Sequence, residues 1–251
     1  MKRTAILLYG VLSYFVFFAT ILYAIGFVGN IWVPKSIDSA PTSSFLVALL
    51  TNLGLLALFA VQHSVMARPA FKRAWTRIIP EAAERSTYVL LSSVALIVLF
   101  VFWQPMGGVI WQFESAWIQA IFYTLFGLGW ATVFLSTFLI NHFDLFGLRQ
   151  VWLEFRGRPY TNLGFVTPGP YRWVRHPLYF GFILSAWFTP TMTVAHLVYA
   201  TMITSYILIG IQFEENDLRD ALPDYERYQA EVPMLIPRPP QRMPNPVVGQ
   251  A

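Results

Sequence analysis

The chain has 251 residues, of which 56% are hydrophobic, 17% are aromatic and only 12% are charged, and its net charge is +4. Soluble domains carry about 25% charged residues, so this composition excludes an ordinary soluble domain and indicates a protein whose solvent is the lipid bilayer. The absence of cysteine excludes a disulfide framework, a thiolate metal site and covalent catalysis through a cysteine sulfur.

Five apolar segments are long enough, or nearly so, to cross a membrane. A bilayer core requires about 20 apolar residues per helix. The last segment is longer than one crossing needs and is interrupted by TPTMT at 189–193, so we expect a helical hairpin with a short first arm. The expected fold is all-α, a polytopic integral membrane bundle of five to six transmembrane helices. The segments are 4–29, 44–67, 86–104, 115–140 and 178–213.

The positions of lysine and arginine predict how these spans are oriented. Sixteen of the 17 basic residues lie on one side of the predicted membrane, and only Lys35 lies on the other. Because cytoplasmic loops retain basic residues, both termini and the active site are expected to face the cytoplasm from a bacterial inner membrane. Six crossings are favoured, because an even number returns the chain to the same side. This bias also accounts for the net positive charge without nucleic acid.

The chain divides into three parts. Residues 1–140 are expected to form N-terminal transmembrane helices, and residues 141–237 a cofactor-binding loop, a C-terminal hairpin and a catalytic module. Residues 238–251 are rich in proline and are expected to be a disordered tail. The first apolar stretch is too long for the core of a signal peptide and lacks a small-x-small cleavage site, so we expect it to remain as the first span.

The stretch PGPYRWVRHPLYFG at 168–181 places rigid and polar residues directly before an apolar segment. A helix that begins after His176, near Pro177, would offer unpaired N–H groups to a carboxylate. Arg172 and Arg175 would add charge-assisted hydrogen bonds. Surfaces on which an aromatic ring can stack are provided by Tyr171, Trp173 and Tyr179. The alternative interpretation is an interfacial aromatic belt with snorkelling arginines.

A second polar cluster, QFEENDLRD at 212–220, follows the last apolar segment. Glu214 and Glu215 would lie at the C-terminal end of a helix, where the helix dipole disfavours negative charge. The hairpin would return them to the membrane face of Arg175 and His176, so these residues or a cationic ligand would compensate the charge. The alternative is an ordinary solvated helix end.

The third cluster, FLINHFDLFGLRQVW at 138–152, ends the fourth span with Asn141, His142, Asp144 and Arg149. His142 and Asp144 are two residues apart, so they would not lie on one face of a helix. A structural helix end is the alternative to a functional site.

The remaining histidines and motifs add little. His63, near the end of the second span, could join the site, although an interfacial or hydrogen-bonded histidine is the favoured interpretation. His196 falls near the far side of the membrane. The sequence contains no His-x-x-x-His pair, no dense set of carboxylates, no G-x-G-x-x-G and no Walker loop, so neither a metal site nor an ordinary nucleotide-binding fold is expected.

The order GPYRWVRHPLYFG, then EENDL, then YERYQAEVPMLIP resembles the C-terminal module of the isoprenylcysteine carboxyl methyltransferase superfamily. The resemblance runs from Gly169 to Pro237, about the last third of the chain. It implies an enzyme that binds S-adenosylmethionine. By analogy, the cofactor-binding residues are Gly169, Tyr171, Arg172, Arg175, His176, Pro177, Tyr179, Glu214 and Glu215.

The upstream segment TFLINHFDLFGLRQVWL resembles, more narrowly, the bacterial methanethiol S-methyltransferases. That resemblance implies methyl transfer to a small thiol, from methanethiol to dimethyl sulfide, with membrane lipids as the surroundings. His142, oriented by Asp144, is then the candidate base, and Arg149 the group that stabilises the thiolate.

Three alternatives remain open at this point. Another member of the superfamily would methylate a prenylated cysteine carboxylate or a phospholipid amine. A non-enzymatic membrane accessory protein would not need the full cofactor motif. A membrane reductase would bind NADPH in place of S-adenosylmethionine.

Overall fold

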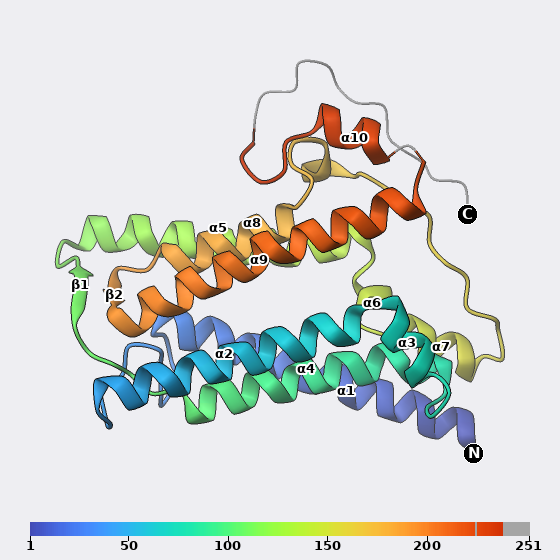
Figure 1. The fold of residues 1–251 in the computed structure, drawn as a ribbon, viewed down its shortest axis with the longest axis horizontal. Helices are drawn as coiled ribbons and strands as arrows, with labels where there is room; N and C mark the ends of the chain where they lie inside the picture. The colour runs from blue at the N-terminus through green and yellow to red at the C-terminus, as the bar shows by residue number, and fades with distance from the viewer. Residues whose placement is uncertain (224, 238–251) are drawn as a thin grey trace.

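The computed structural model describes residues 1–223 and 225–237, and in these ranges the chain is a bundle of helices with one short β-ribbon (Figure 1). The proline-rich tail expected at 238–251 lies outside the described residues. Five helices are long and apolar enough to cross a membrane. They are α1 (Lys2–Gly29), α2 (Phe45–Ala67), α4 (Glu81–Phe102), α5 (Ala116–Ile140) and α9 (Val194–Ala221). The expected polytopic membrane bundle is confirmed.

The expected hairpin consists of α8 (Pro177–Trp187) followed by α9. The first arm is short, as the interruption at 189–193 predicts: α8 has 11 residues, which at 1.5 Å per residue make about 16 Å. Five full-length helices and one half-length helix therefore take the place of the six crossings that the charge pattern favours.

The helices form two layers that run along a common axis. One layer contains α1, α2 and α4, and the other contains α5, α8 and α9 (Figure 1). The layers also touch, since α9 packs against α2 and α1 against α5. The hairpin α8–α9 is therefore held between α5 on one side and α2 on the other.

Two glycines bring α8 and α5 into backbone contact. A Cβ atom built on Gly129 would lie 2.8 Å from the carbonyl oxygen of Gly181, and one on Gly181 would lie 2.6 Å from the carbonyl oxygen of Gly129. In membranes, where lipid is as apolar as leucine, small residues of this kind let helices pack closely. The contact fixes the position of α8 on α5.

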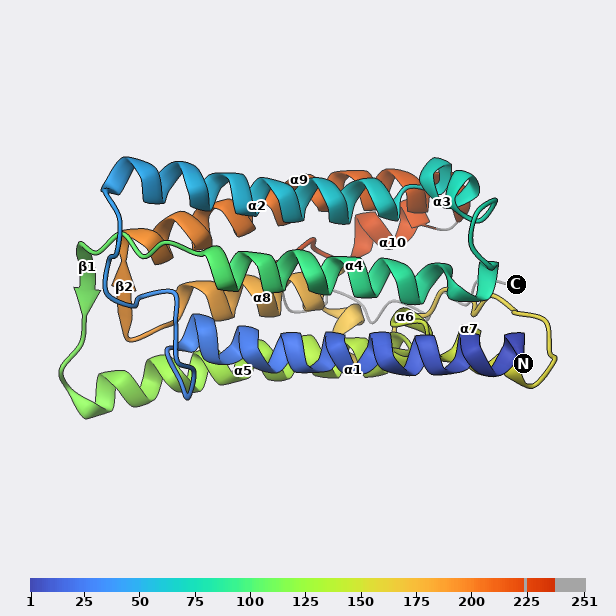
Figure 2. The ribbon, with the colours of Figure 1, turned by 90° about the horizontal axis from the view of Figure 1, so that it is seen from below.

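The two ends of the bundle differ. At one end, β1 (Val109–Gln112) pairs antiparallel with β2 (Thr191–Thr193). The N-terminus and the short helices lie toward the opposite end (Figure 2). These elements are α3 (Pro69–Trp75), α6 (His142–Leu145), α7 (Leu148–Phe155), the 3₁₀ turn η1 (Gly169–Arg172) and α10 (Tyr225–Glu231). The loops rich in arginine and lysine therefore gather at the end that lies away from the ribbon.

Near the ribbon, a buried polar cluster fastens the turn of the hairpin to the loop after α1. We call Asn30, Asp38, Thr193 and His196 the distal clasp. Asp38 lies 2.9 Å from Nδ1 of His196, accepts a hydrogen bond from Asn30 at 2.7 Å and accepts another from Thr193. Nε2 of His196, a fully buried residue, donates to the carbonyl of Ala186 at 3.0 Å. Burial raises the pKa of Asp38, but these partners outweigh burial and hold it below its ordinary value of 3.8.

Candidate functional site

The ends of the α8–α9 hairpin meet at a buried carboxylate. Nε of Arg175 donates to Oε1 of Glu215 at 2.7 Å, and Nε2 of His176 lies 2.9 Å from the same oxygen. Oε2 of Glu215 accepts from the side-chain amide of Gln229 at 2.7 Å. We call Arg175, His176, Glu215 and Gln229 the proximal clasp. Since the side chains of Arg175 and Glu215 are only 9% and 5% exposed, this ion pair survives in a dry place because each oxygen has partners.

The segment that follows α10 covers the clasp. Nη1 of Arg175 donates to the carbonyls of Gln229, at 2.8 Å, and of Val232. The backbone N–H groups of Arg175 and His176 donate to the carbonyls of Pro233 and Met234, at 2.9 and 3.2 Å. Nε, Nη1 and the backbone N–H of Arg175 thus bond to Glu215 and to this segment, so the main role of Arg175 is to fix the shape of the site.

Beside the clasp, polar groups retain binding capacity. The hydroxyl of Tyr179 donates to Oε2 of Glu214 at 2.7 Å, and Glu214 is half-buried. Nε of Arg172 is buried with no hydrogen-bond partner among the described residues. Burial, together with the charge of Glu214, raises the pKa of the Tyr171 phenol. An unpaired guanidinium donor and a half-buried carboxylate therefore belong to the two ends of the same hairpin, which suits a ligand that carries both charges.

Glycine and proline shape the loop that presents these groups. Gly169 has φ of +52°, a left-handed conformation that suits glycine, and it begins the turn η1. Pro177 is the first residue of α8, where proline is favoured because the missing N–H has no partner there in any case. The loop is also tied to α10, since the hydroxyl of Tyr228 donates to the carbonyl of Tyr171. All nine residues expected around the cofactor belong to this loop, to the start of α8 or to the adjoining end of α9.

His142 lies apart from the proximal clasp, in α6. Its Nε2 atom is 2.8 Å from the hydroxyl of Tyr14 and its Nδ1 atom 2.9 Å from the hydroxyl of Thr137. The ring of Phe138 stacks on it with centroids 4.2 Å apart. Burial lowers the pKa of His142. The residue borders a cleft of about 450 Å³ that includes Leu139, Asn141, Leu163 and Val166.

Asp144 is paired with Arg149 rather than with His142. Nη1 of Arg149 donates to Asp144 at 2.9 Å, and the hydroxyl of Tyr160 donates to the other carboxylate oxygen at 3.2 Å. Arg149 also donates to the carbonyl and the hydroxyl of Thr161, both at 2.8 Å. The expected orienting contact from Asp144 to His142 is thus replaced by contacts from Tyr14 and Thr137, and the acid and arginine bind the following loop instead.

Sequence reasoning missed Gln229 and the carbonyls at 229–234. The available signal was their place in YERYQAEVPMLIP, which belongs to the resemblance but names no role for a glutamine. Backbone acceptors leave no mark in composition. The contacts of the proximal clasp with Gln229 and these carbonyls could therefore not be predicted from the sequence.

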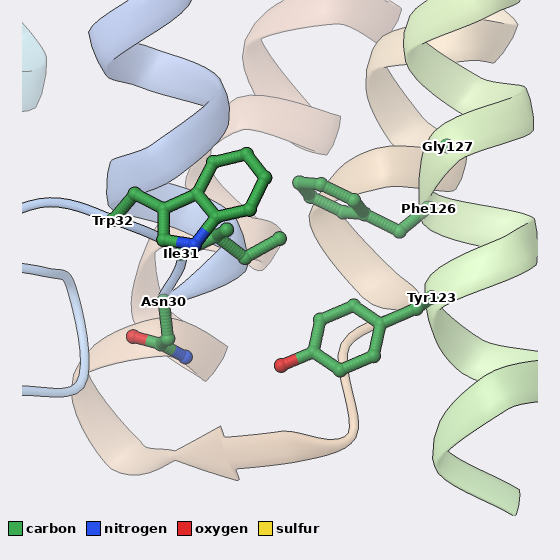
Figure 3. A pocket seen from close by; sticks show the side chains of 6 residues that line it. All are labelled: Asn30, Ile31, Trp32, Tyr123, Phe126 and Gly127. Atoms are coloured by element: carbon green, nitrogen blue, oxygen red, sulfur yellow. The ribbon is translucent and has the colours of Figure 1, made fainter.

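A hollow of about 570 Å³ lies toward the ribbon end, lined by Asn30, Ile31, Trp32, Tyr123, Phe126 and Gly127 (Figure 3). Half of its lining residues are aromatic and none is charged, so it does not suit a charged cofactor. Across residues 1–223 and 225–237, no group of three or more His, Asp or Glu side chains is placed to hold a metal ion.

Comparison with known proteins agrees with this geometry. Residues 152–220 match the isoprenylcysteine carboxyl methyltransferase (ICMT) family. The chain is 58% identical over 238 residues to the methanethiol S-methyltransferase of Crocosphaera subtropica, covering 94% of this chain and 93% of that relative. It is 53% identical over 240 residues to the enzyme of that name from Mycobacterium tuberculosis, covering 95% and 98%. To methanethiol S-methyltransferase 2 of Bradyrhizobium diazoefficiens it is 51% identical over 239 residues, covering 94% and 91%.

The apolar helices, the hairpin site and these relatives together define an integral membrane methyltransferase. The chain belongs to the isoprenylcysteine carboxyl methyltransferase family, within the group that contains the relatives above. A methyl donor follows from that membership. No solved structure matches the chain.

Proposed function

We propose that the chain transfers a methyl group from S-adenosylmethionine to methanethiol and forms dimethyl sulfide. The names of relatives that are 51–58% identical over more than nine tenths of the chain support the choice of acceptor. The observation that carries the proposal is the meeting of the hairpin ends, where Glu215 binds Arg175 and His176 and leaves Glu214 beside them.

The residues of the loop fit S-adenosylmethionine group by group. The buried, unpaired Nε of Arg172 suits the carboxylate of the ligand, as a charge-assisted hydrogen bond. The carboxylate of Glu214 suits the positive charges of the ligand, and the hydroxyl of Tyr179 holds the Glu214 side chain in place. Tyr171 and the exposed ring of Trp173 offer faces on which adenine can stack. When bound, the ligand supplies a methyl group on a positively charged sulfur.

In this proposal the proximal clasp maintains the shape of the site, and the residues beside it bind S-adenosylmethionine. Arg175, His176 and Glu215 keep η1 against the end of α9, while Gly169 and Pro177 set the turn and the helix start. Asp144 and Arg149 form an ion pair, and together they keep the loop after α7 in position.

Charge neutralisation explains why such an enzyme is placed in a membrane. A thiolate and a sulfonium lose their charges as they react, so a site that excludes water favours the reaction over the separated ions. Lipid and aromatic side chains exclude water here, and a small apolar thiol partitions into lipid. Because the chain has no cysteine, positioning of the two substrates supplies most of the acceleration.

The proposed location is the bacterial inner membrane, with both termini and the donor site toward the cytoplasm. The gathering of basic loops at the end of the bundle away from the ribbon supports this orientation. S-adenosylmethionine would then reach the site from the side on which cells make it.

The test is to express the full chain in a host that forms no dimethyl sulfide, supply methanethiol and sample the headspace gas. We expect dimethyl sulfide from the wild-type chain and much less from Glu214→Gln. Calorimetry on the purified protein should show binding of S-adenosylmethionine and not of NADPH. Folded protein that binds the donor but methylates only a prenylated cysteine or a phospholipid amine would refute the assigned acceptor. Binding of NADPH alone would refute the reaction class.

A further inference from the structure

A line of polar side chains runs between α2 and α4 inside the bundle. The amide of Gln62 donates to the hydroxyl of Ser92 at 3.4 Å, and Ser92 lies 3.2 Å from Nδ1 of His63. Nε2 of His63 lies 2.8 Å from the hydroxyl of Tyr88. Polar groups in transmembrane helices are costly and mark functional sites more often than solvated ones do, and the contacts described above leave this line without a role.

The hydrogen bonds along this line have a direction. Because Ser92 accepts from Gln62, its own proton is free to point at Nδ1 of His63. The hydroxyl of Tyr88 lies 2.8 Å from Nε2 and 3.1 Å from Nδ1 of the same ring, so it contacts the imidazole without being in line with one N–H group. Among the described residues, Tyr88 has no hydrogen-bond partner besides the His63 ring, so its hydroxyl proton can turn toward a ligand.

A second hydroxyl comes from the helix that carries Glu214. Tyr206 of α9 lies 3.2 Å from the hydroxyl of Ser64, and its ring meets the ring of His63 edge-on, with centroids 6.5 Å apart. The ring of Tyr88 lies 5.0 Å from His63, by the same measure. Two phenols from different helices thus flank one histidine, and both are half-buried.

Helix α9 joins this cluster to the donor site. It carries Tyr206 and, eight residues or about 12 Å further along, Glu214, which accepts from the hydroxyl of Tyr179. The cluster around Tyr88 therefore lies along the helix that leads to the donor site, on the side of α2 and α4.

Both cations and acids surround the cluster. The guanidinium of Arg85 lies 5.7 Å from the centroid of the Tyr88 ring, and that of Arg68 lies 5.5 Å from the centroid of Phe213. Arg68 is also paired with Asp217 at 3.0 Å. The charged groups of the surrounding elements are Arg68, Lys72, Glu84, Arg85, Glu214 and Asp217. Three of these six are cations, and Arg85, which lies over the Tyr88 ring, forms no ion pair with another described residue, so it can attract an anion bound there.

We propose that the sulfur of the methyl acceptor binds as a thiolate between α2, α4 and α9, where it accepts hydrogen bonds from the hydroxyls of Tyr88 and Tyr206. His63 is a positioning residue that holds the Tyr88 hydroxyl toward the sulfur. The inference rests on the proposed function, and it places the thiol here rather than in the cleft beside His142, whose ring nitrogens face Tyr14 and Thr137.

The chemical step balances without a further reactant. The thiol gives its proton to water, and the sulfur lone pair forms a bond to the methyl carbon. The bond from that carbon to the sulfonium of the donor breaks, and its electron pair stays on the sulfur that leaves. Since a small alkyl thiol titrates at or above the cysteine value of about 8.5, hydrogen-bond donors that stabilise the anion lower the pH at which the bound thiol reacts.

The test compares Tyr88→Phe with Tyr14→Phe in the purified full chain. Each change removes one hydroxyl beside a histidine and keeps the ring. We expect Tyr88→Phe to lower kcat/KM for methanethiol by about 10- to 100-fold, the loss of one hydrogen bond to a charged group, and to leave the Kd for S-adenosylmethionine within about twofold. Tyr14→Phe should behave as wild type, since it alters the cluster around His142.

A pH profile separates thiolate binding from a merely structural role. The apparent pKa seen in kcat reports the bound complex, so it should lie below that of the free thiol in wild type and rise in Tyr88→Phe. His63→Gln should move it the same way by a smaller amount. A structural defect would lower kcat equally at every pH.

The outcomes are distinguishable. If wild type binds no S-adenosylmethionine, the proposed function itself fails. If wild type forms dimethyl sulfide and Tyr88→Phe matches it while Tyr14→Phe loses activity, the acceptor lies beside His142 and the inference is overturned. Where Tyr88→Phe also loses the donor, Tyr206→Phe takes its place, and loss of donor binding there too would equally contradict a thiol-specific role.

Discussion

The two clasps at opposite ends of the α8–α9 hairpin are built from the same chemistry and have different surroundings. In the distal clasp, Asp38 meets His196, and in the proximal clasp, Glu215 meets His176. Both carboxylates are buried and have several partners. Each clasp has one buried polar atom without a partner among the described residues, Oδ1 of Asn30 in the distal clasp and Nε of Arg172 beside the proximal one. Beside the proximal clasp this donor is accompanied by a second carboxylate, Glu214, which is half-buried and bonded to Tyr179. The comparison teaches that a satisfied buried ion pair indicates a fastening, while additional groups of opposite charge next to it indicate a site for a ligand that carries both charges.

The largest expected effect follows from Glu215→Ala. This change leaves Arg175 buried without its carboxylate, and breaking a buried pair in this way costs about 3–5 kcal/mol. We expect the unfolding temperature in detergent to fall sharply and methyl transfer to be lost. Glu215→Gln, which keeps one acceptor oxygen, should recover part of the loss. An unchanged unfolding temperature would show that Glu215 is a ligand group and not a fastening.

Glu214→Gln should weaken binding of the donor without lowering the stability of the fold. Because Glu214 is bonded only to Tyr179 among the described residues, its loss should leave the unfolding temperature near wild type. Loss of one charge-assisted contact, worth about 1.5–3 kcal/mol, should raise the Kd for S-adenosylmethionine by about 10- to 100-fold in calorimetry. Asp220→Asn, an exposed acid on the same helix, is the matched control. Equal effects from both variants would point to general electrostatics.

The distal clasp should affect stability without affecting chemistry. Asp38→Asn keeps the shape of the side chain but weakens the contact with His196, at an expected cost of about 1–3 kcal/mol. The unfolding temperature should fall, while kcat and both KM values of the protein that remains folded stay near wild type. A change in the KM for either substrate would show that the two ends of the hairpin are coupled.

The smallest expected effect is the pH dependence of the stability that the distal clasp contributes. The folded pKa of Asp38 lies below its ordinary value of 3.8, so its contribution to stability is complete above that value and is lost as the pH falls through the lower, folded pKa. The difference in unfolding temperature between wild type and Asp38→Asn should therefore shrink below about pH 4. A constant difference down to pH 2 would contradict an ionised Asp38.

Hydropathy predicted the spans and the hairpin with its short arm, because both depend on how many apolar residues follow one another. It also placed Arg175 and His176 at the membrane face of Glu214 and Glu215, since the two arms return to one side. Rotation of a helix about its own axis was not predictable. A helix that is apolar all round, such as α2, does not reveal which face meets its neighbour, so the contacts of His63 with Tyr88 and Ser92 could not be read from the chain.

The third polar cluster shows the same limit at short range. Asp144 was expected to orient His142, and Arg149 takes the carboxylate instead. The turn at Gly147, with φ of +88°, brings α7 back toward α6 and places Arg149 beside the acid. A bend set by one glycine reverses which neighbour a side chain meets, and no count of residues between two polar groups anticipates it.

The acceptors of Arg175 have a consequence for how the enzyme is made. Its guanidinium is bonded to carbonyls 54 and 57 positions downstream, and its backbone N–H to Pro233. Glu215 on α9 neutralises the arginine, but these further hydrogen bonds form only after the segment behind α10 has left the ribosome. The cover of the proximal clasp is therefore completed last, after every long helix has been synthesised.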